Sequence, residues 1–333
     1  MTQAVNKQWI YARKPVGEVG PEHFEPRAAT VPEPGPGEAL VRTTLLSIDP
    51  ASRAWMAVRT YRAQLEPGEV MAGWGLGEVV KSNSDRVAPG DLVSGEFGWQ
   101  QYIALPANRL TKENRAHKPE HILGVLGITG LTAYFGMLDV GRPRPGETVL
   151  VSGAAGAVGS IAGQIAKLAG CKVVGTTRGA EKCAWLTGEL GFDAAIDYKA
   201  GGIYRQLKAV CPDGVDVYFD NTGGDVLDAA LARMNLFGRV VCCGNVSQYN
   251  ATTPAAGPAG VPGFLVTKRI RMEGFVVMDF YNRRQQAEAA LAQWLADGKL
   301  KAPVDIVEGF DNMPVALAGM FQGKNRGKLA VRV

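Results

Sequence analysis

Short runs of β-branched and aromatic residues alternate with apolar segments at helical spacing through the second half of the chain. Each short run predicts a buried strand, and each spaced segment predicts a helix that covers it. The predicted strands span residues 149–151, 171–177, 194–197, 215–220, 239–243 and 269–277. Alternation of this kind predicts an α/β fold with a doubly wound parallel sheet.

The front of the chain has a different pattern. Between residues 9 and 105, short alternating runs are broken by Pro and Gly, which predicts an irregular, β-rich antiparallel barrel. The connector 119–139 is apolar at helical spacing, and a further helix is expected at 283–296. The segment 251–262 is interpreted as an exposed loop. The last segment, 301–333, has the pattern of strand, helix, turn and strand, and we expect it to return to the first domain.

Length and composition narrow the class of protein. The 333 residues are 46% hydrophobic and 20% charged, so we expect two folded domains with substantial cores. The net charge of +4 comes from scattered Lys and Arg, which does not indicate nucleic-acid binding. No window approaches the about 18 apolar residues of a membrane span, and the first residues lack a signal-peptide core. We therefore expect no membrane association and a cytoplasmic location.

Cysteine and histidine are placed unfavourably for a metal or a hydrolytic centre. The five cysteines all lie in the second half, and Cys171, Cys242 and Cys243 fall in predicted strands, so we expect buried, reduced thiols. His117 and His121 have the spacing of a metal pair but flank a proline, which favours solvated loop histidines. The chain has no Gly-x-Ser-x-Gly motif, so a hydrolytic triad is not predicted.

The residues after the first strand of the second half are very small and lead into a helix. Ala154 stands at the first glycine position of a G-x-G-x-x-G pattern, with Gly156 and Gly159 at the second and third. Such a turn alone is equally typical of a tight connection. Here a second strand completes a βαβ unit over residues 147–177, so we interpret the turn as a dinucleotide-binding cradle.

The end of the second strand indicates which dinucleotide is bound. A site for NAD(H) places a carboxylate there to accept the ribose 2′-hydroxyl. This chain has Arg178 at the strand end and Lys182 one helical turn later. Glu181 is the one carboxylate close by, and a solvated acid favoured by the helix dipole is its simpler interpretation. Two cations suit a 2′-phosphate, so NADP(H) is the predicted cofactor. The alternative is that Arg178 and Lys182 are simply solvated residues at the start of a helix.

Several stretches then resemble one family in its own order over nearly the whole chain. They are residues 153–160 and 163–175, Ser47-Ile48-Asp49-Pro50, Thr132-Ala133-Tyr134, Gly191-Phe192-Asp193, Tyr218-Phe219-Asp220-Asn221, Ser247-Gln248-Tyr249-Asn250 and residues 323–328. The chain resembles the zinc-independent medium-chain dehydrogenase/reductases. Within them it is most similar to the NADP-dependent alkenal/one oxidoreductases, a branch with leukotriene B4 12-hydroxydehydrogenase/prostaglandin reductases, plant alkenal double-bond reductases and bacterial curcumin-reductase-like enzymes.

The resemblance implies how the two halves are joined. A Rossmann domain at 127–298 would bind NADP(H), inserted in a GroES-like substrate domain made of residues 1–126 and a C-terminal return at 299–333. It also implies an active site in the cleft between the domains, and a homodimer. Alcohol dehydrogenases of the same superfamily place a zinc-binding Cys where this chain has residues 47–49, and a Gly-His-Glu motif where it has residues 72–75. Neither Cys nor His occurs here, so no zinc is expected.

The resemblance also carries site residues over to this chain. Gly156, Ala157, Val158 and Gly159 would bind the pyrophosphate, with Lys182 and Tyr198 at the adenosine phosphate, where Arg178 adds a positive charge that many relatives lack. The residues implied for the nicotinamide half are Asn221, Cys243, Gly244, Asn245, Val246, Ser247, Tyr249, Phe275, Val276, Val277 and Asn325. The alternative for Asn221 and Asn325 is a turn-forming role beside glycine. The alternative for residues 275–277 is an ordinary buried strand.

These expectations together predict a reductase. Hydride addition to the β-carbon of an α,β-unsaturated aldehyde or ketone leaves an enolate, and Tyr249 is the predicted donor to its oxygen. Alternatively, Tyr249 only packs over the cofactor. The rival functions are a secondary alcohol or hydroxy-eicosanoid dehydrogenase and a non-catalytic NADPH-binding protein. Ala51 stands where many relatives have a tyrosine, which leaves substrate preference open.

Overall fold

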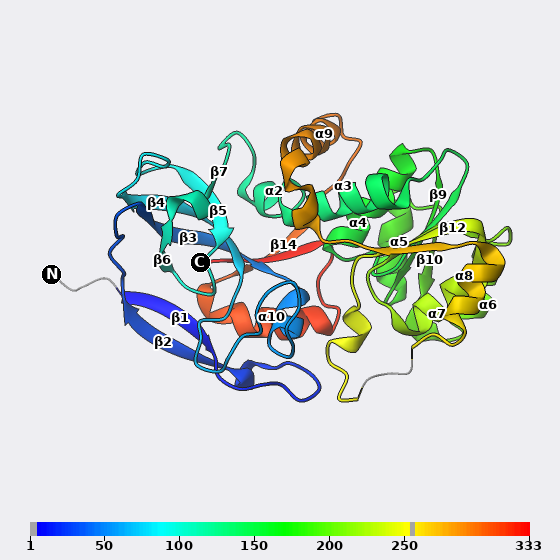
Figure 1. Cartoon of the computed structure of the whole chain (residues 1–333), viewed down its shortest axis with the longest axis horizontal. Helices are drawn as coiled ribbons and strands as arrows, with labels where there is room; N and C mark the ends of the chain where they lie inside the picture. Colours follow the sequence, from blue (N-terminus) through cyan, green and yellow to red (C-terminus); the bar gives the residue numbers. More distant parts are fainter. Residues whose placement is uncertain (1–4, 254–256) are drawn as a thin grey trace. The chain divides into compact units, whose positions relative to one another are not determined.

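The computed structural model describes residues 5–253 and 257–333. The chain forms two compact units (Figure 1). The first unit consists of the chain up to Leu123 with Val304–Asn325 and Leu329–Val333, and the second of Gly124–Pro303 with Arg326–Lys328. Among the described residues, no helix is long and apolar enough to cross a membrane.

The second unit is built on one parallel sheet. Its strands are β8 (Thr148–Val151), β9 (Lys172–Thr177), β10 (Ala194–Asp197), β11 (Val215–Asp220), β12 (Met234–Cys242) and β13 (Arg271–Gly274). Their order across the sheet is β10-β9-β8-β11-β12-β13. Every pair is parallel. This is the 3-2-1-4-5-6 order of a doubly wound dinucleotide-binding fold, in which the chain changes direction between β8 and β11.

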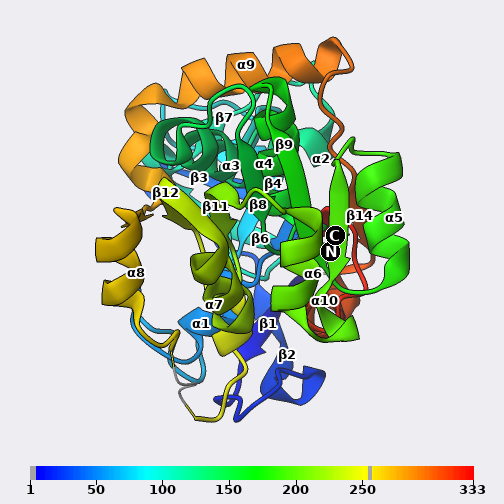
Figure 2. The ribbon, with the colours of Figure 1, turned by 90° about the vertical axis from the view of Figure 1, so that its right-hand side faces the viewer.

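Helices cover both faces of this sheet (Figure 2). They are α3 (Ile128–Phe135), α4 (Ala157–Leu168), α5 (Ala180–Gly188), α6 (Ile203–Val210), α7 (Gly224–Arg233), α8 (Val261–Lys268) and α9 (Arg284–Ala296), with the π-helical η3 (Gly136–Gly141) continuing α3. The short 3-10 helices are η4 (Tyr198–Ala200), η5 (Val246–Gln248) and η6 (Val277–Arg283). Burial on both faces explains why the central strands β8 and β9 carry continuous apolar runs rather than alternating ones.

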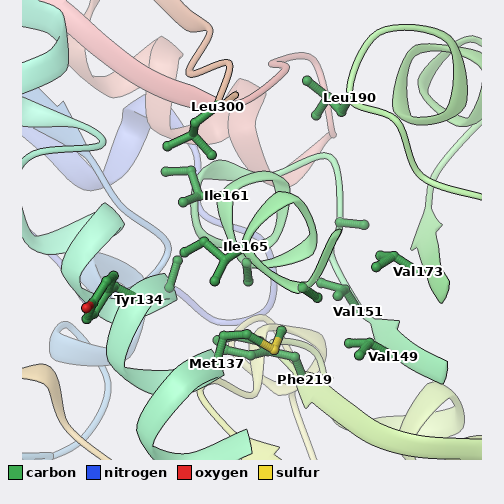
Figure 3. Packing of buried hydrophobic residues seen from close by; sticks show 14 of the residues in the cluster. Tyr134, Met137, Val149, Val151, Ile161, Ile165, Val173, Leu190, Phe219 and Leu300 are labelled. Atoms are coloured by element: carbon green, nitrogen blue, oxygen red, sulfur yellow. The ribbon is translucent and has the colours of Figure 1, made fainter. Parts of the chain in front are cut away.

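Successive side chains of a strand point to opposite faces, and the packing follows that rule. Val149 and Val151 of β8 belong to one core with Phe219 of β11, whereas Leu150 belongs to the core on the opposite face. Figure 3 shows the first core, where Ile165 of α4 lies on the side of Met137 and Phe219, and Ile161 lies beside Leu300. Burying each such side chain contributes about 1.5–3 kcal/mol, so this packing fixes α4 and the turn that precedes it.

The first unit is antiparallel and irregular. Its strands are β1 (Val5–Tyr11), β2 (Phe24–Thr30), β3 (Glu38–Ile48), β4 (Trp74–Ser82), β5 (Leu92–Glu96), β6 (Tyr102–Pro106), β7 (Thr111–Lys112), β14 (Val304–Glu308) and β15 (Lys328–Arg332). The larger sheet has the order β14-β15-β3-β4-β5-β7, with β6 also on β3, and β1 pairs with β2. The helices are α1 (Ala51–Trp55), α2 (Pro119–Leu123) and α10 (Met313–Phe321), with the 3-10 helices η1 (Pro21–His23), η2 (Ala107–Arg109) and η7 (Phe310–Asn312). β15 therefore lies beside β3, far from it in sequence (Figure 1).

Several expected elements differ from the structure at their ends. The strand expected at 269–277 stops at Gly274, and the one expected at 239–243 already begins at Met234 and ends at Cys242. Cys171 and Cys243 consequently flank strands rather than lie within them. The loop expected at 251–262 ends in the first turn of α8, and its residues 254–256 lie outside the described part. An apolar run marks burial but not the residue at which regular pairing stops.

Candidate active site

The turn between β8 and α4 depends on glycines at two positions. Gly153 has a φ of +56°, a left-handed conformation that side chains disfavour. A Cβ on Gly159 would lie 2.4 Å from the carbonyl oxygen of Gly153, so the helix can approach the turn only without a side chain there. Gly156 is the N-cap residue, and the first turn of α4 has no acidic residue. The backbone N–H groups at this helix start form an anion-binding cradle.

Ala154 fits the first position of this cradle because a neighbouring residue has no side chain. It is completely buried, and its N–H donates to the carbonyl oxygen of Thr176 at 3.0 Å. A Cβ on Gly175 would lie 2.8 Å from the Cβ of Ala154. The space that the usual first glycine would leave is thus provided by Gly175 on β9, which the sequence analysis did not single out.

Asp220 organises the ends of β8 and β11, where the sheet changes direction. It is buried, and its Oδ1 accepts from Ser152 Oγ at 3.1 Å and from the Tyr218 hydroxyl at 2.7 Å. The same oxygen accepts the backbone N–H groups of Thr222 at 2.9 Å and Gly223 at 2.8 Å. Sequence reasoning gave Asp220 no role. The available signal was an acid that ends an otherwise apolar strand.

Asn221 is held against the glycine turn by two hydrogen bonds. Its Nδ2 donates to the carbonyl oxygen of Ser152 at 2.7 Å, and its backbone N–H donates to Ser152 Oγ at 2.9 Å. Both residues lie at the carboxyl edge of the sheet, where ligands bind in doubly wound folds. The structure therefore brings Asn221 and the predicted pyrophosphate cradle together.

The loop after β12 lies along the end of β11. The N–H groups of Cys243 and Gly244 donate to the carbonyl oxygen of Asp220 at 2.9 and 3.1 Å. Further along, Val246 N–H donates to the Asn221 carbonyl at 3.2 Å and Ser247 N–H to the Thr222 carbonyl at 3.1 Å. This ladder brings the predicted residues 243–249 to the same edge as Asn221.

Two titratable side chains of this loop are held in their neutral forms. Burial raises the pKa of Tyr249, a hydrogen bond with the Asn245 backbone opposes the shift, and Cys243 adds to it. Burial, with Asp220 and Cys242 nearby, raises the pKa of Cys243 to about 12. Tyr249 is therefore a hydrogen-bond donor at neutral pH, whereas Cys243 stays a thiol with little nucleophilicity.

The ends of β9 and β10 carry the residues predicted for the adenosine phosphate. Arg178 follows β9, Lys182 lies in the first turns of α5, and Tyr198 follows β10. Burial raises the pKa of Tyr198, and the positive charge of Arg178 opposes this shift. Glu181 is exposed as expected, but it also forms an ion pair with Arg326.

Residues 275–277 do not continue a strand, which corrects that expectation. Phe275 and Val276 follow the end of β13, and Val277 begins η6. The Phe275 ring packs edge-on against Phe219, with centroids 6.5 Å apart. Their backbone is thus free of sheet pairing at the carboxyl edge. Asn325 belongs to the first unit, so its relation to these residues stays a prediction.

His117 lies in a loop as expected, whereas the other two histidines are packed into the first unit. His121 lies in α2 and is half-buried, not in a loop as expected, and burial lowers its pKa. His23 is buried in the first unit, with its Nδ1 3.0 Å from the Gly20 carbonyl oxygen. Within the described ranges no three His, Cys, Asp or Glu side chains gather as a metal site would require.

Comparisons with known proteins cover the whole chain. A family model described as the N-terminal domain of oxidoreductase matches residues 7–112, and one described as zinc-binding dehydrogenase matches residues 157–297. The chain is 41% identical to the NADPH-dependent curcumin reductase of Escherichia coli, over 98% of this chain and 97% of that protein. It is 40% identical to the 2-alkenal reductase (NADP(+)-dependent) of Nicotiana tabacum, over 91% and 89% of the two chains.

A solved structure agrees with these relatives. The crystal structure of CurA from Vibrio vulnificus in complex with NADPH superposes with a TM-score of 0.93 at 40% identity, covering 98% of this chain and 99% of that one. The resemblance inferred from the sequence is confirmed, and the doubly wound sheet is that of the same fold. The chain belongs to the zinc-independent medium-chain dehydrogenase/reductases, in the branch of the curcumin, prostaglandin and 2-alkenal reductases.

Proposed function

We propose that this protein is an NADPH-dependent reductase of the activated C=C bond of α,β-unsaturated aldehydes and ketones. The observation that carries the proposal is identity of about two residues in five, along nearly the whole chain, to reductases named for NADPH and for 2-alkenals. A 2-alkenal is by definition an α,β-unsaturated aldehyde. The carboxyl edge of the parallel sheet supports the same reading, because the predicted cofactor residues gather there.

The cradle fits a dinucleotide. The missing side chain at Gly159 and the left-handed Gly153 leave the N-terminal N–H groups of α4 open to a pyrophosphate. Gly156, Ala157, Val158 and Gly159 would hold that group, and Arg178, Lys182 and Tyr198 the 2′-phosphate. Asn221, residues 243–249 and 275–277, and Asn325 would line the nicotinamide half. When bound, NADPH supplies the hydride that reduces the β-carbon of the substrate.

Tyr249 is the proposed catalytic residue. A tyrosine phenol keeps its proton at neutral pH, and burial raises the pKa of Tyr249 further, so it can donate a hydrogen bond to an oxygen that becomes negative. The backbone ladder from Cys243 to Ser247 fixes the loop on which it stands. A donor that is held in place before the reaction stabilises the enolate without reorganisation.

Zinc has no place in the proposed reaction. One matching family model is described by zinc binding, but the donor set of this chain does not fit a zinc ion. The segments 47–49 and 72–75 contain neither Cys nor His. The described residues offer no cluster of three ligating side chains either. Polarisation of the carbonyl therefore falls to hydrogen-bond donors.

We also propose a homodimer as the assembly and the cytoplasm as the location. Both rest on the family and on the sequence, and neither enters the argument for the chemistry. Light scattering of the purified protein tests the first, and fractionation of the producing cell tests the second.

The decisive experiment follows the loss of absorbance at the reduced nicotinamide band. NADPH and NADH are offered with 2-alkenals, alkenones, quinones and saturated ketones, to the native protein and to Tyr249→Phe. We expect turnover of the conjugated substrates with NADPH preferred, and a loss of about 100-fold in kcat for the variant, since it lacks the enolate donor. NADPH binding without any turnover would contradict the proposal and favour a cofactor-binding protein, and oxidation of saturated alcohols alone would favour a dehydrogenase.

A further inference from the structure

Glu181 and Arg326 form an ion pair within the second unit. Arg326 Nη2 lies 3.4 Å from Glu181 Oε1, and their side chains are 44% and 82% exposed. Glu181 stands in the first turn of α5, beside Lys182 and just after the end of β9. An acid near this strand end favours the ribose 2′-hydroxyl of NAD(H) and repels a 2′-phosphate. A cation paired with this acid neutralises its charge and so weakens the repulsion of a 2′-phosphate.

The backbone of the returning chain fixes the position of Arg326. The next residue, Gly327, donates its N–H to the carbonyl oxygen of Ala155 at 2.9 Å and forms a parallel bridge with Gly156. Gly327 has a φ of +66°, and a Cβ there would lie 2.3 Å from the Pro303 carbonyl oxygen. Lys328 N–H also donates to that oxygen, at 3.2 Å. Gly327 is therefore attached directly to the glycine turn of the proposed pyrophosphate site, and Arg326 is the residue before it.

We propose that Arg326 is a specificity-determining residue, which selects NADPH over NADH by adding a third cation to Arg178 and Lys182 at the 2′-phosphate and by neutralising Glu181. The inference rests on the proposed cofactor. Arg326 lies near the C-terminus, far in sequence from the end of β9 and from the glycine turn, so neither of these patterns points to it.

The chemistry of arginine suits this task. Its planar guanidinium binds phosphate oxygens through two parallel N–H donors, more strongly than a neutral donor does. In the free protein Glu181 holds the half-exposed side chain near its place of action, so less rotamer freedom is lost when phosphate binds. The 2′-phosphate would then compete with the Glu181 carboxylate for the same guanidinium.

The test measures binding rather than turnover. Dissociation constants of NADPH, NADH, 2′-AMP and 5′-AMP are determined calorimetrically for the native protein and for Arg326→Ala. We expect NADPH and 2′-AMP to bind about tenfold more weakly to the variant, because a charged hydrogen bond is lost and Glu181 is left unpaired. NADH and 5′-AMP should not bind more weakly, since they carry no 2′-phosphate and their ribose 2′-hydroxyl is compatible with a free Glu181 carboxylate.

Two further variants separate the mechanism from a general disturbance. Arg332→Ala is the matched control: its side chain is also 44% exposed and also paired with carboxylates, Glu120 and Glu308, but it lies in the first unit. It should leave all four constants unchanged. Adding Glu181→Gln to Arg326→Ala should restore part of the lost NADPH affinity, because the unpaired acid is then gone.

The outcomes distinguish the inference from the proposed function. Equal weakening of NADPH and NADH in Arg326→Ala, or no weakening of either, overturns the assignment of Arg326 while the cofactor stands. A native protein that binds neither dinucleotide overturns the proposed function, and the inference with it.

Discussion

The two ends of the proposed cofactor site use different kinds of group: backbone N–H groups at the pyrophosphate end and charged side chains at the 2′-phosphate end. At the pyrophosphate end the proposed contacts come from backbone groups, since Gly159 has no room for a side chain and Gly153 has a left-handed φ of +56°. At the 2′-phosphate end the candidates are long charged side chains on the surface, of which Arg326 is 44% exposed. A backbone site cannot be altered without moving the fold, whereas a side-chain site can.

This difference separates two properties of the protein. We expect the ability to bind any dinucleotide to depend on packing at the switch point of the sheet, where Asp220 accepts hydrogen bonds from residues that follow β8 and β11. We expect the choice between two dinucleotides to depend on exposed charges, each of which contributes little alone. Substitutions at the first end should therefore affect NADPH and NADH alike, and those at the second should affect their ratio.

The largest effect is expected from Gly159→Ala. The new Cβ would lie 2.4 Å from the Gly153 carbonyl oxygen, so the turn or α4 must shift. We expect a loss of about 1–3 kcal/mol in the free energy of unfolding and the loss of measurable affinity for both dinucleotides. Urea unfolding and calorimetric titration measure the two quantities.

Gly188→Ala is the control for that variant. Gly188 ends α5, and a Cβ there would meet nothing within 4 Å. Alanine at this position should leave both affinities unchanged and stabilise the protein by up to about 1 kcal/mol. If Gly159→Ala bound NADPH normally, the glycine turn would not be the pyrophosphate site.

The sequence predicted the second unit better than the first. Strands β10 and β11 have the expected bounds, because continuous apolar runs closed by polar residues mark buried parallel strands. In the first unit β3 runs for 11 residues, Glu38–Ile48, with register shifts against β4 that no alternation pattern contains. The bounds and register of irregular antiparallel strands depend on contacts with segments distant in sequence, such as that of β3 with β15. The local sequence pattern does not contain this information.

The candidate site could be proposed from the sequence where it depends on local chemistry. The glycine turn, Arg178 and Tyr249 stand next to strand ends that the pattern locates. Asp220, Gly175 and Arg326 were missed because their contacts are with residues far away in sequence: Ser152, Ala154 and Glu181. The end of β13 was misplaced since the run 275–277 is apolar without being paired.

A smaller effect than that of Gly159→Ala is expected from Asp220→Asn. The amide oxygen can take the place of Oδ1, which accepts from Ser152, Tyr218, Thr222 and Gly223, but a neutral oxygen accepts these hydrogen bonds more weakly than a carboxylate does. We expect a loss of about 1–3 kcal/mol in stability and an affinity for both dinucleotides reduced by about tenfold, because Asn221 and the loop 243–249 lose their common support. Asp228→Asn, on the exposed face of α7, should change neither quantity. A changed NADPH/NADH affinity ratio with unchanged NADH affinity would contradict this prediction, because Asp220 would then act on the 2′-phosphate end and not on the pyrophosphate end.

The smallest effect is expected from salt. Raising the ionic strength from about 0.05 M to about 0.5 M shortens the distance over which exposed charges act, so the NADPH/NADH affinity ratio should fall several-fold. The backbone cradle contributes equally to both dinucleotides and cancels in that ratio. Lys182→Gln should lower the ratio at low salt and flatten its salt dependence, whereas Lys172→Gln, at the opposite end of β9, should leave the salt dependence as it is. A ratio that does not change with salt would mean that buried contacts, not the exposed cations, recognise the 2′-phosphate.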